Sequence, residues 1–235
     1  MALTVEPQGQ RKAEIIKRKT AGKNIKNSKT IYDVLNGNCQ FENAIQDTKI
    51  KNLKIISSNV DLSGLEVETA TENRRAFLLK DVCEKFINSH ENDFSYILID
   101  CPPSLSLLTV MALVSAKSLI VPLQAEFFAL EGLSQLIKTI ERVKENLNPE
   151  LHIRGVLLTM FDKRNKLSSQ VDTEARQFFE NKVYQTVIPR NVRLSEAPSH
   201  GKPVLIYDKM CLGSKSYLSF TDEFLKQENI MDSAA

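Results

Sequence analysis

The chain has 235 residues, of which 42% are hydrophobic and 26% are charged, proportions that are ordinary for a soluble globular protein with one large domain. Its four cysteines are widely spaced and form no CxxC pair, which argues against a zinc site and a disulfide framework. The N-terminus has no apolar signal-peptide core and no apolar run is long enough to span a membrane, so we expect a cytoplasmic protein without a membrane partner.

Positive charge is concentrated in the first thirty residues. Eight lysines and arginines there face two glutamates, a net charge of +6, which leaves −4 for the rest of a chain whose total is +2. A basic arm of this kind can bind nucleic acid or an anionic membrane. So polar a run is also typical of a solvated linker, and we favour the linker. We therefore divide the chain into a basic arm, 1–29, and a folded domain, 30–235.

Strand and helix patterns alternate along the folded domain. The predicted strands are at 53–57, 95–99, 118–122, 151–160 and 182–189, with a short extended piece at 204–207. The predicted helices are at 74–88, 104–116, 130–147, 168–182 and 214–229. Alternation of this kind is typical of βαβ units. We expect an α/β fold with three layers, in which helices flank a mainly parallel sheet.

Residues 96–104, YILIDCPPS, contain the clearest candidate for a binding residue. An apolar run ends there in Asp100, and open α/β sheets bind their ligands at the carboxyl ends of their strands. An aspartate at that place, next to a phosphate site, is the Walker B arrangement that holds Mg²⁺ through water. A solvated aspartate that caps a strand fits the segment equally well.

Four blocks of the sequence resemble one known family. They are YILIDCPPSLSLLTVMAL, VPLQAEFFALEGLSQLIKTIE, GVLLTMFDKRNKLSSQV and TVIPRNVRLSEAPSHGKPVLIYD. In order and spacing they resemble the ParA/Soj chromosome- and plasmid-partitioning ATPases of the MinD/ParA superfamily. The resemblance implies a P-loop NTPase-like fold that binds ATP and Mg²⁺, forms a homodimer around two nucleotides, binds DNA nonspecifically on the nucleoid and has a ParB-like partner that stimulates hydrolysis.

The resemblance assigns roles to residues near Asp100 and near the N-terminus. Asp100 corresponds to the Walker B acid, and Gln8 and Pro102 are expected at the nucleotide. Residues 5–10, VEPQGQ, resemble the family's LDPQGN after its second strand, so Glu6 takes the place of the aspartate that positions the attacking water. Glutamate is longer by one methylene, and a misplacement of about 1 Å can cost about 10²-fold in rate. A chance match of this short stretch is the alternative.

The family's phosphate loop has no counterpart in these residues. Family members begin with a strand and a KGGxGKT loop, whose backbone N–H groups hold phosphate. The nearest sequence is TAGKN at 20–24. Lys17 stands where the motif needs its first glycine, and Asn24 stands where it needs Ser or Thr. We expect a chain that is truncated at its N-terminus and lacks the first strand and the P-loop. Its dimer should be weakened, and its ATP binding and hydrolysis should be defective. Whether it is an enzyme stays open. The alternatives are a non-catalytic DNA- or ParB-binding remnant and a decaying gene product without a stable role.

Two further groups of residues follow from the resemblance. Thr159, Met160 and Pro189 are expected near the adenine base, with ordinary packing at strand ends as an equal alternative. The arginines and lysine of IPRNVRLSEAPSHGKP are expected to contact DNA backbone phosphates, namely Arg190, Arg193 and Lys202. In the alternative, the two arginines form surface salt bridges with Glu196 or Asp208, which contribute little to stability.

Overall fold

The computed structural model describes residues 2–5, 29–90, 94–101, 104, 106–126 and 129–232. These residues form two compact units. Unit 1 contains the described residues up to 120 together with 138–152, and unit 2 contains 121–126, 129–137 and 153–232. The predicted arm, 1–29, lies outside the described residues apart from 2–5 and Lys29.

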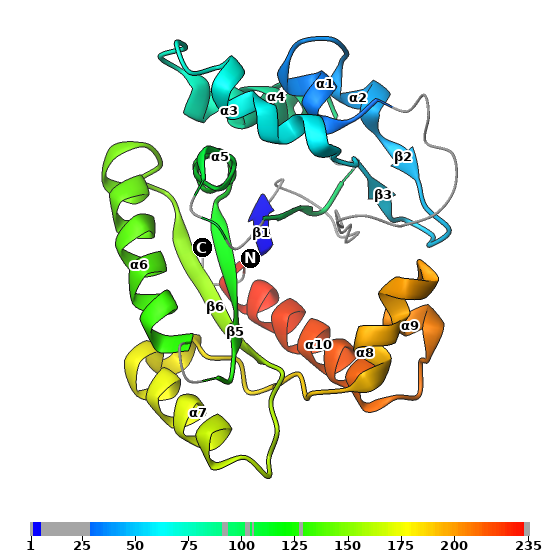
Figure 1. Ribbon diagram of the computed structural model, residues 1–235, viewed down its shortest axis with the longest axis vertical. Coiled ribbons are helices and arrows are strands. Elements are labelled where there is room, and N and C mark those ends of the chain that lie inside the picture. The colour runs from blue at the N-terminus through cyan, green and yellow to red at the C-terminus, as the bar shows by residue number, and fades with distance from the viewer. Residues whose placement is uncertain are drawn as a thin grey trace. The chain divides into compact units, whose positions relative to one another are not determined.

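Three strands form the sheet of unit 1. They are β1 (Ala2–Val5), β4 (Ile97–Asp100) and the first half of β5 (Ser118–Gln124), and β1 lies between the other two (Figure 1). β1 pairs antiparallel with both neighbours, with Ala2 opposite Asp100 in β4 and Ile120 in β5. Because β4 and β5 both run against β1, they are parallel to each other. The predicted α/β fold is confirmed, and β1 is its antiparallel exception.

The rest of unit 1 consists of short helices and a separate hairpin. The hairpin pairs β2 (Gln46–Asp47) with β3 (Lys54–Ile55), so the strand predicted at 53–57 is present in shortened form. The helices are α1 (Ile31–Leu35), α2 (Phe41–Ala44), η1 (Val60–Gly64), α3 (Leu65–Glu68), η2 (Arg75–Phe77), α4 (Leu78–Ser89) and α5 (Leu107–Ser115), with the second half of α6 (Ala129–Asn146).

An aromatic cluster and one buried amide hold unit 1 together. α4 buries Phe86, whose ring stacks on Phe41 at 4.5 Å and lies 5.4 Å from Phe94. The buried Asn148 donates hydrogen bonds of 2.7–3.1 Å to three carbonyl oxygens at the end of α5, those of Leu113, Val114 and Ala116. Helix ends leave such carbonyls unpaired, so this side chain stabilises the connection from α5 to β5.

Unit 2 is built around β6 (His152–Thr159) and the helices beside it. Hydrogen bonds join Lys117 to His152 at one end of β5 and Ala125 to Thr159 at the other, so the two strands run in the same direction. Figure 1 shows α7 (Lys166–Phe179) and α10 (Leu212–Asp232) on either side of β6. The remaining short helices are η3 (Glu180–Lys182), α8 (Val192–Glu196), η4 (Ala197–His200) and α9 (Val204–Tyr207).

Two predicted extended segments of unit 2 had different outcomes. The segment at 182–189 runs along β6, with parallel bridges from Val183 to Val156 and from Pro189 to Phe161. The extended piece expected at 204–207 was wrong, because these residues form α9. Pro203 precedes the helix and its carbonyl accepts a hydrogen bond from Ile206 N at 2.9 Å. Its fixed φ favours a helix start, which outweighs the strand preference of the sequence VLIY.

Two of the four thiols are buried and should resist modification. Burial raises the pKa of Cys83 to about 12 and that of Cys101 to about 11, whereas Cys39 and Cys211 are only half-buried. We expect a disulfide reagent such as DTNB at pH 8 to modify only Cys39 and Cys211 rapidly in the native chain, and all four thiols in denaturant. Rapid reaction of four thiols in the native chain would contradict this packing.

The same shifts predict a loss of stability at alkaline pH. A thiol whose folded pKa is raised favours the native state fully below its ordinary pKa of about 9, and this contribution is lost as pH rises towards the folded value. The urea midpoint should therefore fall between pH 9 and pH 11, and it should fall less in a Cys83→Ala variant.

Candidate functional site

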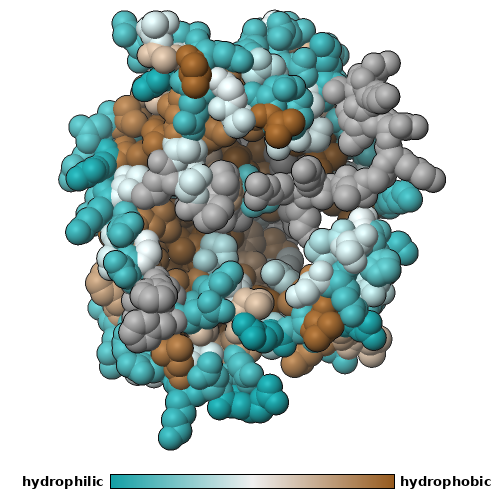
Figure 2. All heavy atoms as spheres, viewed as in Figure 1, coloured by the Kyte–Doolittle hydropathy of each residue, from teal (hydrophilic) through white to brown (hydrophobic). Residues whose placement is uncertain are grey.

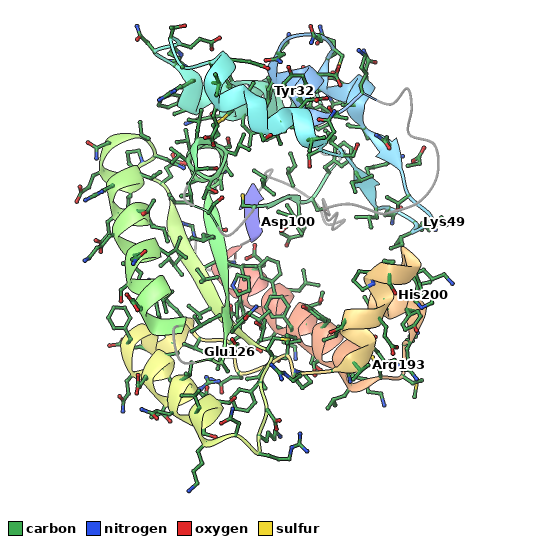
Figure 3. All side chains as sticks on the ribbon, in the orientation of Figure 1. Tyr32, Lys49, Asp100, Glu126, Arg193 and His200 are labelled. Atoms are coloured by element: carbon green, nitrogen blue, oxygen red, sulfur yellow. The ribbon has the colours of Figure 1, made fainter. Side chains whose placement is uncertain are left out.

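Asp100 is the last residue of β4, at the carboxyl end of the strand where the sequence predicts it. Its side chain is exposed, whereas the next residue, Cys101, is buried. Beyond them the buried Thr109 of α5 donates a hydrogen bond of 2.6 Å to the carbonyl oxygen of Ser104. Figure 3 labels Asp100 among the side chains of unit 1. The strand and α5 thus fix the backbone on both sides of this carboxylate.

The residues around Asp100 do not make a complete site for Mg²⁺ and a triphosphate. In the part of the chain that the structure describes, no three His, Cys, Asp or Glu side chains are grouped to hold a metal ion. Mg²⁺ is usually bound through one or two carboxylates and the phosphates themselves. None of the eight glycines in the sequence is adjacent to another, so these residues contain no KGGxGKT loop to hold the phosphates. Three predicted site residues, Glu6, Gln8 and Pro102, lie outside the described residues.

The residues predicted near the adenine base come together in unit 2. Thr159 ends β6, and Phe161 bridges to Pro189 on the adjacent extended segment. Phe161 N donates to the Ile188 carbonyl at 3.1 Å, and Arg190 N donates to the Phe161 carbonyl at 3.0 Å. Met160, between Thr159 and Phe161 in the sequence, has φ = 54°, in the left-handed region. Such a backbone costs on the order of 1 kcal/mol or more in a residue other than glycine, and strain of this kind is common at binding sites.

Charged residues surround the same strand ends. Asp162 accepts two hydrogen bonds from the Arg164 side chain, at 3.0 and 3.1 Å, and one from its backbone N–H. These bonds, with a smaller contribution from the nearby Arg190, lower the pKa of Asp162 to about 2. The loop that carries them belongs to the mainly hydrophilic surface at the lower end of Figure 2. Sequence reasoning did not predict this pair, although its two members are only two residues apart.

Arg190 forms an ion pair with Glu126, which follows β5. The distance from Arg190 Nη2 to Glu126 Oε1 is 3.5 Å, and the two side chains are 63% and 57% exposed. The sequence interpretation named Glu196 and Asp208 as salt-bridge partners, and for Arg190 the structure shows a different one. Glu126 is 64 residues away along the chain, so only the fold could reveal this contact.

Arg193 has the partners that the salt-bridge alternative named. Its Nη1 lies 2.7 Å from Glu196 Oε2 and its Nε lies 3.5 Å from Asp208 Oδ2. The Tyr207 hydroxyl also donates to Glu196 at 3.2 Å, and the His200 ring stacks on Tyr207 at 4.9 Å. The Arg193 hydrogen bond holds the pKa of Glu196 below its usual value. This network, part of which is labelled in Figure 3, joins α8, η4 and the turn after α9.

The third predicted DNA residue, Lys202, is exposed between η4 and α9. Its backbone N–H donates to the Ala197 carbonyl at 3.2 Å, after Gly201 turns the chain with φ = 59°. Exposed apolar side chains accompany the cations, since Met210 is 72% and Leu212 is 60% exposed. The surface formed by α8, η4, α9 and the start of α10, called the α8–α10 surface below, therefore carries arginine and lysine beside apolar groups.

The sequence matches an AAA-domain family model over residues 4–153. It is 51% identical over 199 residues to the chromosome partitioning protein ParA of Caulobacter vibrioides, covering 85% of this chain and 74% of that protein. It is 46% identical over 193 residues to the sporulation initiation inhibitor protein Soj of Bacillus subtilis, covering 82% of this chain and 75% of that protein.

Solved structures resemble the fold as well. Cobyrinic acid a,c-diamide synthase from Mycobacterium smegmatis superimposes with a TM-score of 0.72 at 29% identity, covering 88% of this chain and 76% of that one. A structure of the same enzyme with bound ADP and magnesium superimposes with a TM-score of 0.65 at 32% identity, covering 74% of this chain and 69% of that one. No helix in the described part of this chain is long and apolar enough to cross a membrane.

Proposed function

Because this chain belongs to the ParA/Soj family of partitioning ATPases, we propose that it acts in chromosome or plasmid partitioning by binding duplex DNA without sequence preference. The observation that carries the proposal is the exposure of Arg190, Arg193 and Lys202 in unit 2. Arginine and lysine neutralise backbone phosphates and release counterions, which needs no base-specific contact.

We propose that nucleotide plays only a small part in what these 235 residues do. Asp100 ends β4, and Thr159 and Met160 lie beside Pro189 at the end of β6, which supports the proposed roles of a Walker B acid and of adenine contacts for these residues. The clustered N–H donors that hold phosphates are missing from the sequence. Mg-ATP should therefore bind weakly, and hydrolysis should be slow or absent because phosphoryl transfer depends on electrostatic positioning of the phosphates.

The proposed partners are duplex DNA on the nucleoid and a ParB-like protein. A homodimer that depends on two shared nucleotides should be weak here, since the phosphate loop is missing. Each chain then offers DNA a single basic surface, without the gain in effective concentration that two linked surfaces provide. We accordingly expect modest, strongly salt-dependent affinity.

Neutralising Arg190 tests the proposal. In fluorescence anisotropy with a duplex of arbitrary sequence, Arg190→Gln should weaken binding and lower the slope of log K against log salt by about 0.9, the value for one phosphate contact. Arg142→Gln, which removes the same charge from an exposed position on α6 in unit 1, is the matched control and should change little.

A second variant separates this surface from the basic arm. It replaces five cations of the arm with glutamine, namely Arg11, Lys12, Lys17, Arg18 and Lys19. Arg190 and the neighbouring α8–α10 surface should preserve most of the chain's DNA binding in this variant. If binding disappears while Arg190→Gln binds like the unmodified chain, the arm is the nucleic-acid element and the proposed surface is wrong.

A further inference from the structure

We propose that Glu126 and DNA phosphate compete for the guanidinium group of Arg190, so that Glu126 limits how tightly the chain binds DNA. The inference rests on the proposed function, because it needs Arg190 to be a phosphate contact. It adds a residue from the loop after β5 to a surface that the sequence places only around 190–202.

The backbone at both ends of this ion pair is anchored. Arg190 N is bonded to the Phe161 carbonyl at 3.0 Å, and Glu126 N to the Gln124 carbonyl at 2.8 Å. The preceding Ala125 is bonded to Thr159 at the end of β6. The side chains meet from two different strand ends, while both remain more than half exposed. The Arg190 side chain can thus leave Glu126 for a phosphate without breaking any of these backbone hydrogen bonds.

Arg190 and Arg193 differ in how firmly they are held. Arg193 contacts two carboxylates, and the shorter contact is 2.7 Å to a Glu196 oxygen that also accepts the Tyr207 hydroxyl. Turning Arg193 towards DNA would break its contacts with Glu196 in α8 and with Asp208 in the turn after α9. Among the described residues, Arg190 has one carboxylate contact, and it is longer, at 3.5 Å. Arg190 is therefore the arginine that is more readily released to a phosphate, and Arg193 is held more firmly by its two carboxylates.

The nearby Asp162 is a weaker competitor than Glu126. Its carboxylate is occupied by both the side chain and the backbone of Arg164, and it affects Arg190 through charge alone. Of the carboxylates in the described ranges, Glu126 is the one in direct contact with Arg190. The free energy of an exposed ion pair of this kind is small, and it corresponds to a factor of about two to five in an equilibrium constant. That factor is the gain in DNA affinity expected when Glu126 loses its charge.

The test uses the full chain and a duplex of arbitrary sequence in fluorescence anisotropy at low salt. Glu126→Gln should tighten binding by about two- to fivefold relative to Glu131→Gln. Glu131 is an exposed acid on the first turn of α6, so its replacement controls for the loss of one negative charge. Glu126→Gln should also steepen the salt dependence, because the freed Arg190 then releases a counterion of its own on binding.

The Arg190→Gln, Glu126→Gln double variant completes a double-mutant cycle. In an Arg190→Gln background, Glu126→Gln should no longer tighten binding beyond the Glu131→Gln control. Equal effects of Glu126→Gln and Glu131→Gln, with Arg190→Gln still weakening binding, would overturn the competition and leave the proposed DNA surface intact. If Arg190→Gln has no effect on binding, both the competition and the proposed role of Arg190 are wrong.

Discussion

We expect the Gly155→Ala variant to lose about 3 kcal/mol of free energy of unfolding, because a side chain at this position has no room. A Cβ atom on Gly155 would lie 2.7 Å from Cζ and 3.0 Å from the hydroxyl oxygen of Tyr184. The tyrosine ring is 1% exposed and packs edge-on against Phe220 at 4.8 Å, so it cannot move aside without disturbing α10. Urea unfolding followed by circular dichroism measures the change.

Another glycine provides the matched control. Gly132 lies exposed in α6, and a Cβ atom there would meet nothing within 4 Å. Gly132→Ala should therefore stabilise the chain, by up to about 1 kcal/mol, through helix propensity alone. A smaller side chain in the Gly155→Ala, Tyr184→Leu double variant should recover part of the loss. An unchanged urea midpoint for Gly155→Ala would contradict the packing between β6 and the segment that carries Tyr184.

The second large effect is expected from the ion pair between Arg154 and Glu228. It joins β6 to α10, and the side chains are only 7% and 9% exposed. Glu228→Gln removes the charge and keeps the shape, so Arg154 loses its charged partner in a buried place. Breaking a buried pair in this way typically costs about 3–5 kcal/mol. The loss should appear as a lower urea midpoint with an unchanged slope.

Replacing both partners separates the cost of a buried charge from the value of the contact. Arg154→Met with Glu228→Leu should be much more stable than Glu228→Gln, because no unpaired charge is left inside. Asp162→Asn, which breaks the exposed pair with Arg164, should shift the free energy of unfolding by less than about 1 kcal/mol. Equal losses for Glu228→Gln and Asp162→Asn would show that the pair beneath α10 is not buried in solution.

The sequence was informative where local pattern determines structure. Sequence patterns predicted the helices that became α4, α6, α7 and α10, and the acid and prolines after a buried run located the end of β4. The sequence did not predict the direction of β1, because a strand of four residues such as ALTV can pair with neighbours of either direction. α9 was missed because Pro203, which immediately precedes the helix, acts against the strand preference of the residues after it.

The candidate site was predictable only where its residues belong to a family motif or lie close together in the sequence. Family motifs identified Arg190, Arg193 and Lys202, and the short spacing between Arg193 and Glu196 made that salt bridge a natural alternative. The partner of Arg190 was not predictable, since Glu126 meets it through two strand ends that the fold brings together. The strain at Met160 also has no signal in the sequence, because methionine is not a residue that favours a positive φ.

We propose that Arg190 and the α8–α10 surface bind duplex DNA without control by nucleotide in these 235 residues. The most direct test measures the affinity of the full chain for duplex DNA with and without Mg-ATP, in parallel with a calorimetric titration of Mg-ATP. We predict the same affinity for DNA in both conditions, abolished neither by omitting nucleotide nor by Asp100→Ala, and no micromolar binding of Mg-ATP. A tenfold or greater increase in DNA affinity on adding Mg-ATP, lost in Asp100→Ala, would contradict the account.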